Sequence, residues 1–205
     1  MKIVLPTGRL LDDAMELLRQ AIPKLSIEEN RELIHSNGAH EILLAKPADV
    51  PTYVEEGADI GVTGRDMVRE KSADVFIPLS LPFGVCRVSV ARPEEDTGSP
   101  EEMEGYRIAT EYPSITREFF RSLGVPVEII VVAGSTELAP RAGMADAVVD
   151  VVQTGNTLTA NGLEEIETIL ESSALLLVNR ISQKTKFDRV NELVYSIREV
   201  IKNGT

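Results

Sequence analysis

The 205-residue sequence has no tryptophan, one cysteine, two histidines and few aromatic residues of any kind. Because aromatic residues make up only 4% of the chain, its core has to be built from Leu, Ile, Val and Ala. Such a composition favours parallel strands covered by helices, since strands buried on both faces are rich in aliphatic residues. The single cysteine, Cys86, excludes an internal disulfide and is typical of a reducing compartment.

Long hydrophobic runs are also lacking. The apolar start of the chain ends at Gly8-Arg9, too early for a signal peptide or an anchor, and no later stretch is long enough to cross a bilayer. We therefore expect a cytoplasmic protein. Cations are scarce, with 21 Lys and Arg against 33 Asp and Glu and a net charge of -12, which disfavours a general nucleic-acid or membrane surface. An anionic ligand would need local cations, backbone N–H groups or a metal.

Apolar residues make up 43% and charged residues 26% of the chain, which indicates a globular protein with a packed core. Short aliphatic runs predict strands at residues 3–5, 41–45, 59–62, 75–79, 85–91, 107–110, 127–132, 147–151 and 175–178. Helical spacing predicts helices at residues 10–18, 50–56, 65–71, 115–123, 137–141, 157–162 and 190–201. This alternation indicates an α/β fold with mostly parallel sheets.

Two lobes are expected. The polar stretch 92–100 is typical of a surface loop, which favours a change of lobe nearby, and the last helix can return to the first lobe. We place lobe I at residues 1–87 plus 177–205 and lobe II at residues 88–176. Residues 57–64 and 143–149 both run from a glycine through Ala-Asp into an aliphatic strand. This pattern fits two similar lobes facing a cleft, and equally a chance likeness of helix–glycine–strand units.

The most informative segment is residues 148–158. An aliphatic strand leads to Asp150, a loop with two hydroxyls and a glycine follows, and a helix begins. Backbone N–H groups and the positive end of a helix dipole meet in such a loop, and Gly155 lets a phosphate approach the backbone. Asp150 would accept hydrogen bonds from sugar hydroxyls or hold a Mg²⁺ ion that neutralises pyrophosphate. The segment predicts a phosphosugar ligand; in the structural alternative Thr154 caps a helix and Asp150 is solvated.

Asp150 followed by Thr154-Gly155-Asn156-Thr157 resembles the diphosphate-sugar loop of phosphoribosyltransferases. Many of those enzymes carry two adjacent acids where this chain has Val149-Asp150. With a single acid at this position, the segment and its flanking residues 137–146 and 161–163 resemble the ATP phosphoribosyltransferase family. Further segments resemble the same family, from the first strand to the last helix: residues 8–10, 49–51, 57–61, 86–87, 107–110 and 134–135.

The resemblance implies a pentosyltransferase that transfers phosphoribose from phosphoribosyl pyrophosphate to N1 of ATP and releases pyrophosphate, the first step of histidine biosynthesis, with Mg²⁺. It implies the two-lobed, type II periplasmic-binding-protein-like fold, with the site in the interlobe cleft. Long members of the family carry a C-terminal regulatory domain that binds histidine. This chain ends at Thr205 and resembles the short form. A homo-oligomer and a hetero-complex with a regulatory subunit similar to histidyl-tRNA synthetase are therefore expected.

The family's phosphoribosyl pyrophosphate loop corresponds to Thr154, Gly155, Asn156, Thr157 and Leu158, with Asp150 as the binding and catalytic carboxylate. No nucleophile or general base is required, because adenine N1 has its own lone pair. Mg²⁺ is expected to arrive with the substrate, without a dedicated set of protein ligands, and Asp150 is its candidate protein contact. The candidate contacts for ATP or phosphate are Arg9, Arg31, Lys46, Arg65, Asp66 and Glu137.

Each of these has a structural alternative. Arg31 and Lys46 could be exposed strand-edge charges, Asp66 a partner of a helix dipole, and Glu137 a cap or a support for the loop. A lysine often precedes Gly8 in the family, whereas this chain has Thr7, so another cation takes that role or the role is dispensable. Arg87 and Arg107, at strand ends near the change of lobe, could contact a ligand or form salt bridges across the lobes, and the salt bridges are preferred. His35 and His40 are expected at the surface, outside any catalytic set.

Two other functions compete with this interpretation. A two-lobed fold also serves small-molecule binding or sensing domains without catalysis, because fold does not decide function. Such a domain has no need of the loop that follows Asp150. The loop could also serve a phosphoribosyltransferase whose acceptor is a free base or an amine, against which the match of residues 137–146 argues.

Overall fold

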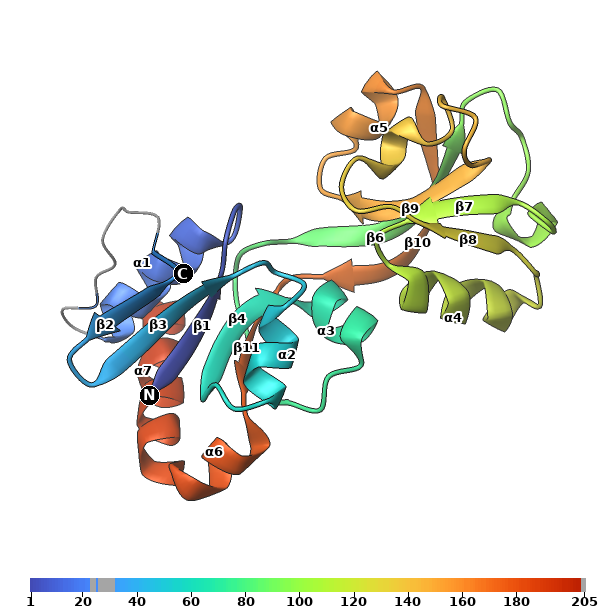
Figure 1. Cartoon of the computed structure of the whole chain (residues 1–205). Coiled ribbons are helices and arrows are strands. Elements are labelled where there is room, and N and C mark those ends of the chain that lie inside the picture. The colour runs from blue at the N-terminus through green and yellow to red at the C-terminus, as the bar shows by residue number, and fades with distance from the viewer. Residues whose placement is uncertain (23–24, 26–31, 204–205) are drawn as a thin grey trace. The chain divides into compact units, whose positions relative to one another are not determined.

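The computed structural model describes residues 1–22, 25 and 32–203, and the chain divides into two compact units. Unit 1 contains Met1–Gly84 and Ser173–Thr205, and unit 2 contains Val85–Ser172. Each unit has its own β-sheet covered by helices (Figure 1). The α/β class expected from the sequence is therefore confirmed.

The sheet of unit 1 has the order β2-β3-β1-β4-β11-β5. Its strands are β1 (Lys2–Pro6), β2 (Ile34–Asn37), β3 (His40–Ala45), β4 (Ile60–Gly64), β5 (Phe76–Ser80) and β11 (Ala174–Val178). Its helices are α1 (Leu11–Ala21), α2 (Val50–Glu55), α3 (Arg65–Lys71), α6 (Arg180–Thr185) and α7 (Phe187–Asn203). Apolar residues of α1 and α7 pack on one face of the sheet, and those of α2 and α3 pack on the other (Figure 1).

The sheet of unit 2 has the order β10-β6-β9-β7-β8. Its strands are β6 (Cys86–Pro93), β7 (Arg107–Thr110), β8 (Glu128–Val131), β9 (Ala147–Val152) and β10 (Leu163–Ser172). Its helices are α4 (Pro113–Leu123) and α5 (Asn156–Ala160), with short 3-10 helices η1 (Pro100–Glu102) and η2 (Thr136–Leu138). Residues of η2 and α5 pack over β9 on one face, and α4 lies on the opposite face (Figure 1).

Both sheets are mixed, although most of the described strands in each run in one direction. In unit 1, β3, β1, β4 and β5 are parallel in direction, whereas β2 and β11 run against them. In unit 2, β8, β7, β9 and β10 share a direction and β6 is reversed. The expectation of mostly parallel sheets thus holds for strand direction, while the ladders beside β6 and β11 are antiparallel.

The two sheets share one topology. The run β3-β1-β4-β11-β5 of unit 1 corresponds to β8-β7-β9-β6-β10 of unit 2, with the same pattern of strand directions. Strands β4 and β9 take equivalent positions, as the similar segments 57–64 and 143–149 suggest. Strands β6 and β11, the reversed members of this shared run, are the first that the chain forms on entering each unit from the other, since β6 follows β5 and β11 follows β10.

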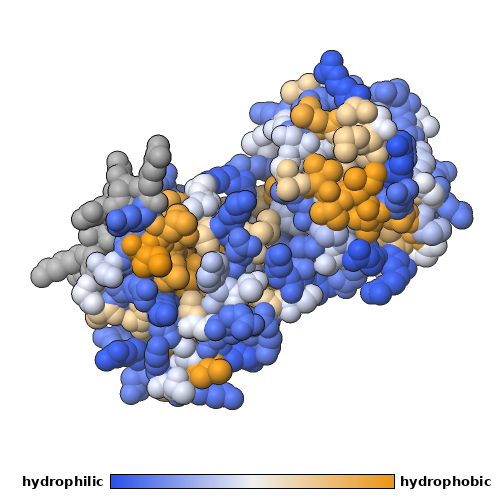
Figure 2. All heavy atoms as spheres, viewed as in Figure 1, coloured by the Kyte–Doolittle hydropathy of each residue, from blue (hydrophilic) through white to orange (hydrophobic). Residues whose placement is uncertain are grey.

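Hydrophilic residues cover most of the face drawn in Figure 2, with hydrophobic patches on both units. None of the helices in the part of the chain that the structure describes is long and apolar enough to cross a membrane. The sequence places both histidines at the surface, and this is wrong for His35. The His35 side chain is buried, and its Nε2 lies 2.9 Å from the Glu32 carbonyl oxygen.

Asn179 joins two helices of unit 1. Its Oδ1 accepts from the N–H groups of Ile181 and Ser182, both at 2.9 Å, which caps α6. Its Nδ2 donates to the carbonyl oxygens of Val54 at 2.7 Å and Glu55 at 3.0 Å, at the end of α2. The side chain therefore satisfies four backbone groups of two separate elements.

We expect Asn179→Ala to lower the free energy of unfolding by about 2 kcal/mol, because it removes a cap and leaves buried groups without partners. Asn179→Asp should not restore stability. It keeps the two accepted bonds but turns a carboxylate oxygen toward two carbonyl oxygens. Urea denaturation of the three proteins measures both effects, and a fully stable Asn179→Asp variant would show that the contacts with α2 contribute little.

Candidate active site

Asp150 lies in β9, two residues before its end, on the face that η2 and α5 cover. The Thr136 hydroxyl donates to Oδ2 of Asp150, and the Val151 backbone N–H donates to Oδ1 at 2.6 Å. Asp150 is half-buried, and Thr136 is fully buried. Asp150 is therefore not the solvated strand-end carboxylate of the structural alternative.

Burial raises the pKa of Asp150 to about 6, and the negative charges of Glu111 and Glu137 add to this increase. The hydrogen bonds from Thr136 and Val151 act in the opposite direction. Glu137 lies beside Thr136 in η2. Glu111 follows β7, where Thr110 is paired with Val149 of β9, so the next position along lies beside Asp150. The three carboxylates form a negative site that favours a cation or a group gaining positive charge.

The loop after β9 presents residues 154–158 at the start of α5. Gly155 has a φ of +83°, a conformation in which glycine is favoured because it lacks a Cβ atom. Gly155 occupies the cap position of α5 and no side chain caps this helix, so Thr154 does not have the capping role of the structural alternative. The side chains of Thr154, Asn156 and Thr157 are exposed. Within the described residues, the backbone N–H groups of positions 154–158 have no hydrogen-bond acceptor. These amides and hydroxyls form a polar cradle.

A cavity of about 450 Å³ adjoins this loop. Thr154, Gly155 and Leu158 line one part of it, and Arg87 and Glu165 line another. Arg87 donates two hydrogen bonds to the Glu165 carboxylate, both at 2.5 Å. The guanidinium is thus already paired with an acid, which supports a structural role for Arg87 rather than a contact with an anion.

The salt bridges of Arg87 and Arg107 do not cross between the units as the sequence suggests. Arg107 pairs with Asp146 at 2.7 Å, and all four partners of these two bridges belong to unit 2. The bridges join β6 to β10 and the start of β7 to the residue before β9. Their physical role is to fix neighbouring strands of one sheet.

Three of the cationic candidates meet at one edge of the sheet in unit 1. Arg9 follows β1, Lys46 follows β3 and Arg65 follows β4, and these strands are adjacent and parallel. The carboxyl ends of parallel strands lie at the same edge, which is where ligands bind in open α/β sheets. All three side chains are exposed, and the Arg65 guanidinium lies 3.3 Å from the Ser80 hydroxyl. Arg31 lies outside the described residues.

Asp66 differs from these cations because it is buried in the first turn of α3. Its carboxylate folds back over Gly64, where an added Cβ atom would lie 2.1 Å from Oδ1 of Asp66. This geometry fits the dipole-partner interpretation and does not present the carboxylate to a ligand. Gly64 therefore serves the close approach of this side chain.

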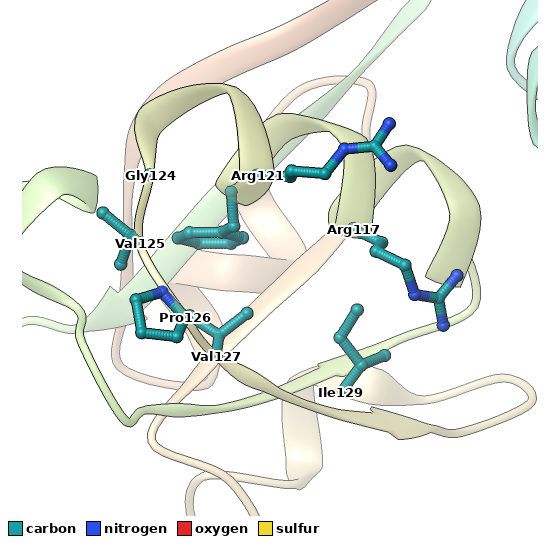
Figure 3. Close-up of a pocket in the computed structure, with 8 residues that line it drawn as sticks. Arg117, Arg121, Gly124, Val125, Pro126, Val127 and Ile129 are labelled. Atoms are coloured by element: carbon teal, nitrogen blue, oxygen red, sulfur yellow. The ribbon is translucent and has the colours of Figure 1, made fainter.

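A larger cavity of about 650 Å³ lies between α4 and β8 in unit 2 (Figure 3). Arg117 and Arg121 extend from α4 above an apolar floor that includes Val127 and Ile129. It contains none of the site residues expected from the sequence.

Sequence reasoning missed Glu111 and Thr136. The signal for Glu111 was its position directly after a strand parallel to the one that carries Asp150. Thr136 lies directly before Glu137, which the sequence did single out, but 14 residues before the carboxylate that it contacts. Only the packing of η2 on β9 brings the two together.

A glycine loop beside an acidic residue near the end of a strand, on a two-unit α/β frame, matches the arrangement expected of a phosphoribosyltransferase-like protein. The frame resembles that of the alkanesulfonate-binding protein SsuA from Xanthomonas axonopodis pv. citri, with 15% identity, a TM-score of 0.60 and coverage of 97% of this chain and 72% of that one. At this identity the likeness shows the fold alone.

The profile of one family, HisG, ATP phosphoribosyltransferase, matches residues 46–199. The chain is 56% identical to the ATP phosphoribosyltransferase of Thermococcus gammatolerans over the full length of both. It is 53% identical to that of Pyrococcus furiosus, with 98% of each chain covered. The ATP phosphoribosyl transferase (HisG:HisZ) complex from Thermotoga maritima contains a chain with 34% identity and a TM-score of 0.89, with 99% of each covered.

This chain belongs to the ATP phosphoribosyltransferase family. It is an enzyme of the first step of histidine biosynthesis, as the resemblance of its motifs implies. A binding or sensing domain without catalysis is not supported.

Proposed function

We propose that unit 2 holds phosphoribosyl pyrophosphate, with the 5-phosphate on residues 154–158 and the ribose hydroxyls on Asp150. The observation that carries this proposal is a loop whose amides have no acceptor among the described residues, directly after the strand that holds the half-buried carboxylate. The exposed hydroxyls of Thr154 and Thr157 supply further donors to a phosphate. Because α5 has only five residues, the amides and hydroxyls contribute more than a helix dipole does.

The reaction forms a bond between adenine N1 and the anomeric carbon while the bond to pyrophosphate breaks, and the leaving oxygen keeps the electron pair. Positive charge therefore grows on the ribose in the transition state. The carboxylate of Asp150, together with the negative charges of Glu111 and Glu137, stabilises this positive charge, and it is in place before the reaction begins. The proton that the adenine loses passes to water.

Cations for the phosphates of ATP or for pyrophosphate come from Arg9, Lys46 and Arg65 at the carboxyl edge of the unit 1 sheet. Their common position after three adjacent parallel strands supports this proposal. Arg31, outside the described residues, stays a candidate for the same role. In an acidic protein, such local clustering is required to offset the overall charge of -12.

The described residues contain no group of three or more His, Cys, Asp or Glu placed to hold a metal. The half-buried carboxylate of Asp150 fits Mg²⁺ that arrives with pyrophosphate, because Mg²⁺ keeps several waters and takes only one or two carboxylates. Asp150 is the candidate protein contact. When bound, the ion would neutralise charge on the leaving pyrophosphate.

We further infer that the enzyme works in the cytoplasm as a homo-oligomer and in a complex with a regulatory subunit similar to histidyl-tRNA synthetase. The HisG:HisZ complex from Thermotoga maritima supports a hetero-complex. The test is an assay of the purified chain with and without a candidate regulatory subunit, Mg²⁺ and histidine. Histidine inhibition of the chain alone would contradict the assignment of regulation to the partner.

Pyrophosphate release from ATP and phosphoribosyl pyrophosphate tests the catalytic proposal directly. A crystal soaked with phosphoribosyl pyrophosphate should show the 5-phosphate within hydrogen-bond distance of the amides of residues 154–158. Phosphate density elsewhere, with this loop empty, would overturn the assignment of the site. Free bases and amines offered as alternative acceptors should give no adduct.

We expect kcat/KM for phosphoribosyl pyrophosphate to fall about tenfold per pH unit below pH 6. The pKa of Asp150 is about 6, so the carboxylate gains a proton as the pH falls through that value. It then loses the negative charge that stabilises the positive ribose. A pH profile from 5 to 8 measures the effect. Phosphate groups of the substrate also titrate near pH 6, so Asp150→Asn is the control. A rate that falls equally in the variant would assign the titration to the substrate.

A further inference from the structure

The Thr136 hydroxyl contacts Asp150, although Thr136 lies outside the loop of residues 154–158. Its side chain is 0% exposed, and it donates a hydrogen bond to Oδ2 of Asp150. The Val151 N–H holds the other oxygen, Oδ1, at 2.6 Å. Each carboxylate oxygen therefore has one internal donor, which fixes the plane of the group and leaves each oxygen able to accept another bond.

Thr136 is itself held in place from the neighbouring strand. Oε1 of Glu111, directly after β7, accepts a hydrogen bond from the Gly134 N–H at 2.7 Å. At the other end of η2, the Ala139 N–H donates to the Thr136 carbonyl oxygen at 3.0 Å. The segment that carries Thr136 is thus tied to the end of β7, and Thr136 in turn is tied to β9.

The chemical nature of the donor matters as much as its position. Among the described residues, the charges that raise the pKa of Asp150 are those of Glu111 and Glu137, both negative, and its hydrogen-bond donors are a hydroxyl and an amide, both neutral. A lysine or arginine in the place of Thr136 would also orient the carboxylate, but it would cancel the charge that the ribose requires. A buried hydroxyl orients the Asp150 carboxylate and does not cancel its negative charge.

We propose that Thr136 is a positioning residue for the reaction: its hydroxyl holds the Asp150 carboxylate at the ribose without neutralising it. This inference rests on the proposed role of Asp150. A carboxylate repelled by two like charges turns toward solvent when its donor is removed. Misplacement of a reacting group by about 1 Å can cost about 100-fold in rate.

The test replaces Thr136 by valine, which keeps the shape and removes the hydroxyl. We expect kcat to fall about 10- to 100-fold with KM for ATP unchanged, and Thr136→Ser to stay within about threefold of the wild type. Thr116→Val is the matched control, because Thr116 is also 0% exposed in unit 2 and its hydroxyl donates to the Tyr112 carbonyl oxygen at 2.7 Å. This control should lose stability but keep its kinetics. If Thr136→Val fails to fold, Thr136→Ala removes the same hydroxyl with less bulk.

Asp150→Asn and the double variant separate this inference from the proposed function. In the Asp150→Asn background, Thr136→Val should cost less than about twofold, because residues that act as one unit are not additive. Full additivity would overturn the inference. If Asp150→Asn is slow but Thr136→Val has the kinetics of the wild type, the role of Thr136 alone is overturned. Wild-type kinetics for Asp150→Asn would instead overturn the proposed role of Asp150.

Discussion

Replacing Asp150 by asparagine is expected to lower kcat/KM for phosphoribosyl pyrophosphate about 100- to 1,000-fold, because the variant lacks the charge that stabilises the positive ribose. The fold should be retained or become more stable. The pKa of Asp150 in the folded protein, about 6, lies above the ordinary value of 3.8, so the native state binds this proton more tightly than the unfolded chain does. The contribution of Asp150 to stability therefore falls as the pH rises between these values, and asparagine carries no such cost.

Asp146→Asn is the matched control for this variant. Asp146 lies in the same unit just before β9, but the hydrogen bonds from Arg107 lower its pKa. The stability that this pair supplies is present at neutral pH and is lost as the pH falls through the lowered pKa. The control should therefore melt at a lower temperature at pH 7 and keep its kinetics. Similar losses of rate in both variants would point to a general disturbance of unit 2 and would contradict a specific role for Asp150.

Replacing Gly155 by valine should raise the KM for phosphoribosyl pyrophosphate about 5- to 30-fold. Gly155 has a φ of +83°, and a β-branched residue is strongly disfavoured there. Apart from its two chain neighbours, no atom of the described residues lies within 4 Å of an added Cβ, so the effect comes from the backbone and not from a clash. The loop would leave the conformation in which its amides converge on the phosphate.

Gly162→Val supplies the control, because Gly162 has a φ of +71° and equally open surroundings but lies after α5. Both variants should lose similar stability in thermal melts, and only Gly155→Val should show the weaker substrate binding in steady-state kinetics and calorimetry. A Gly155→Val variant with wild-type KM would mean that the phosphate does not depend on the conformation of this loop.

Much of the fold follows from local patterns. The helix expected at residues 65–71 coincides with α3, and the aliphatic runs at 107–110 and 147–151 are strands β7 and β9. The helix expected at residues 137–141 is instead a short 3-10 helix ending at Leu138, followed by a turn that contains Pro140 and Gly143. The aliphatic pattern does not predict strand β10, because two register shifts break its alternation of apolar and polar residues.

Some residues of the candidate site can be predicted from local sequence, and others only from the folded structure. Asp150 and residues 154–158 are close in sequence, so their combination of strand, carboxylate and glycine loop was recognisable without a structure. Glu111 and Thr136 join them only through the pairing of β7 with β9 and the packing of η2. Strand register is fixed by the buried faces of the whole sheet, and no local segment encodes it.

The position of β11 also sets the order in which the protein can be made. This strand lies between β4 and β5, yet it comes from residues 174–178, after the whole of unit 2 has been synthesised. Unit 2 is a continuous segment and can fold as it leaves the ribosome, whereas the sheet of unit 1 stays divided until its inserted strand emerges. Until then the edges of β4 and β5 are unpaired, so a nascent chain stalled before residue 174 is exposed to aggregation and proteolysis through its first half.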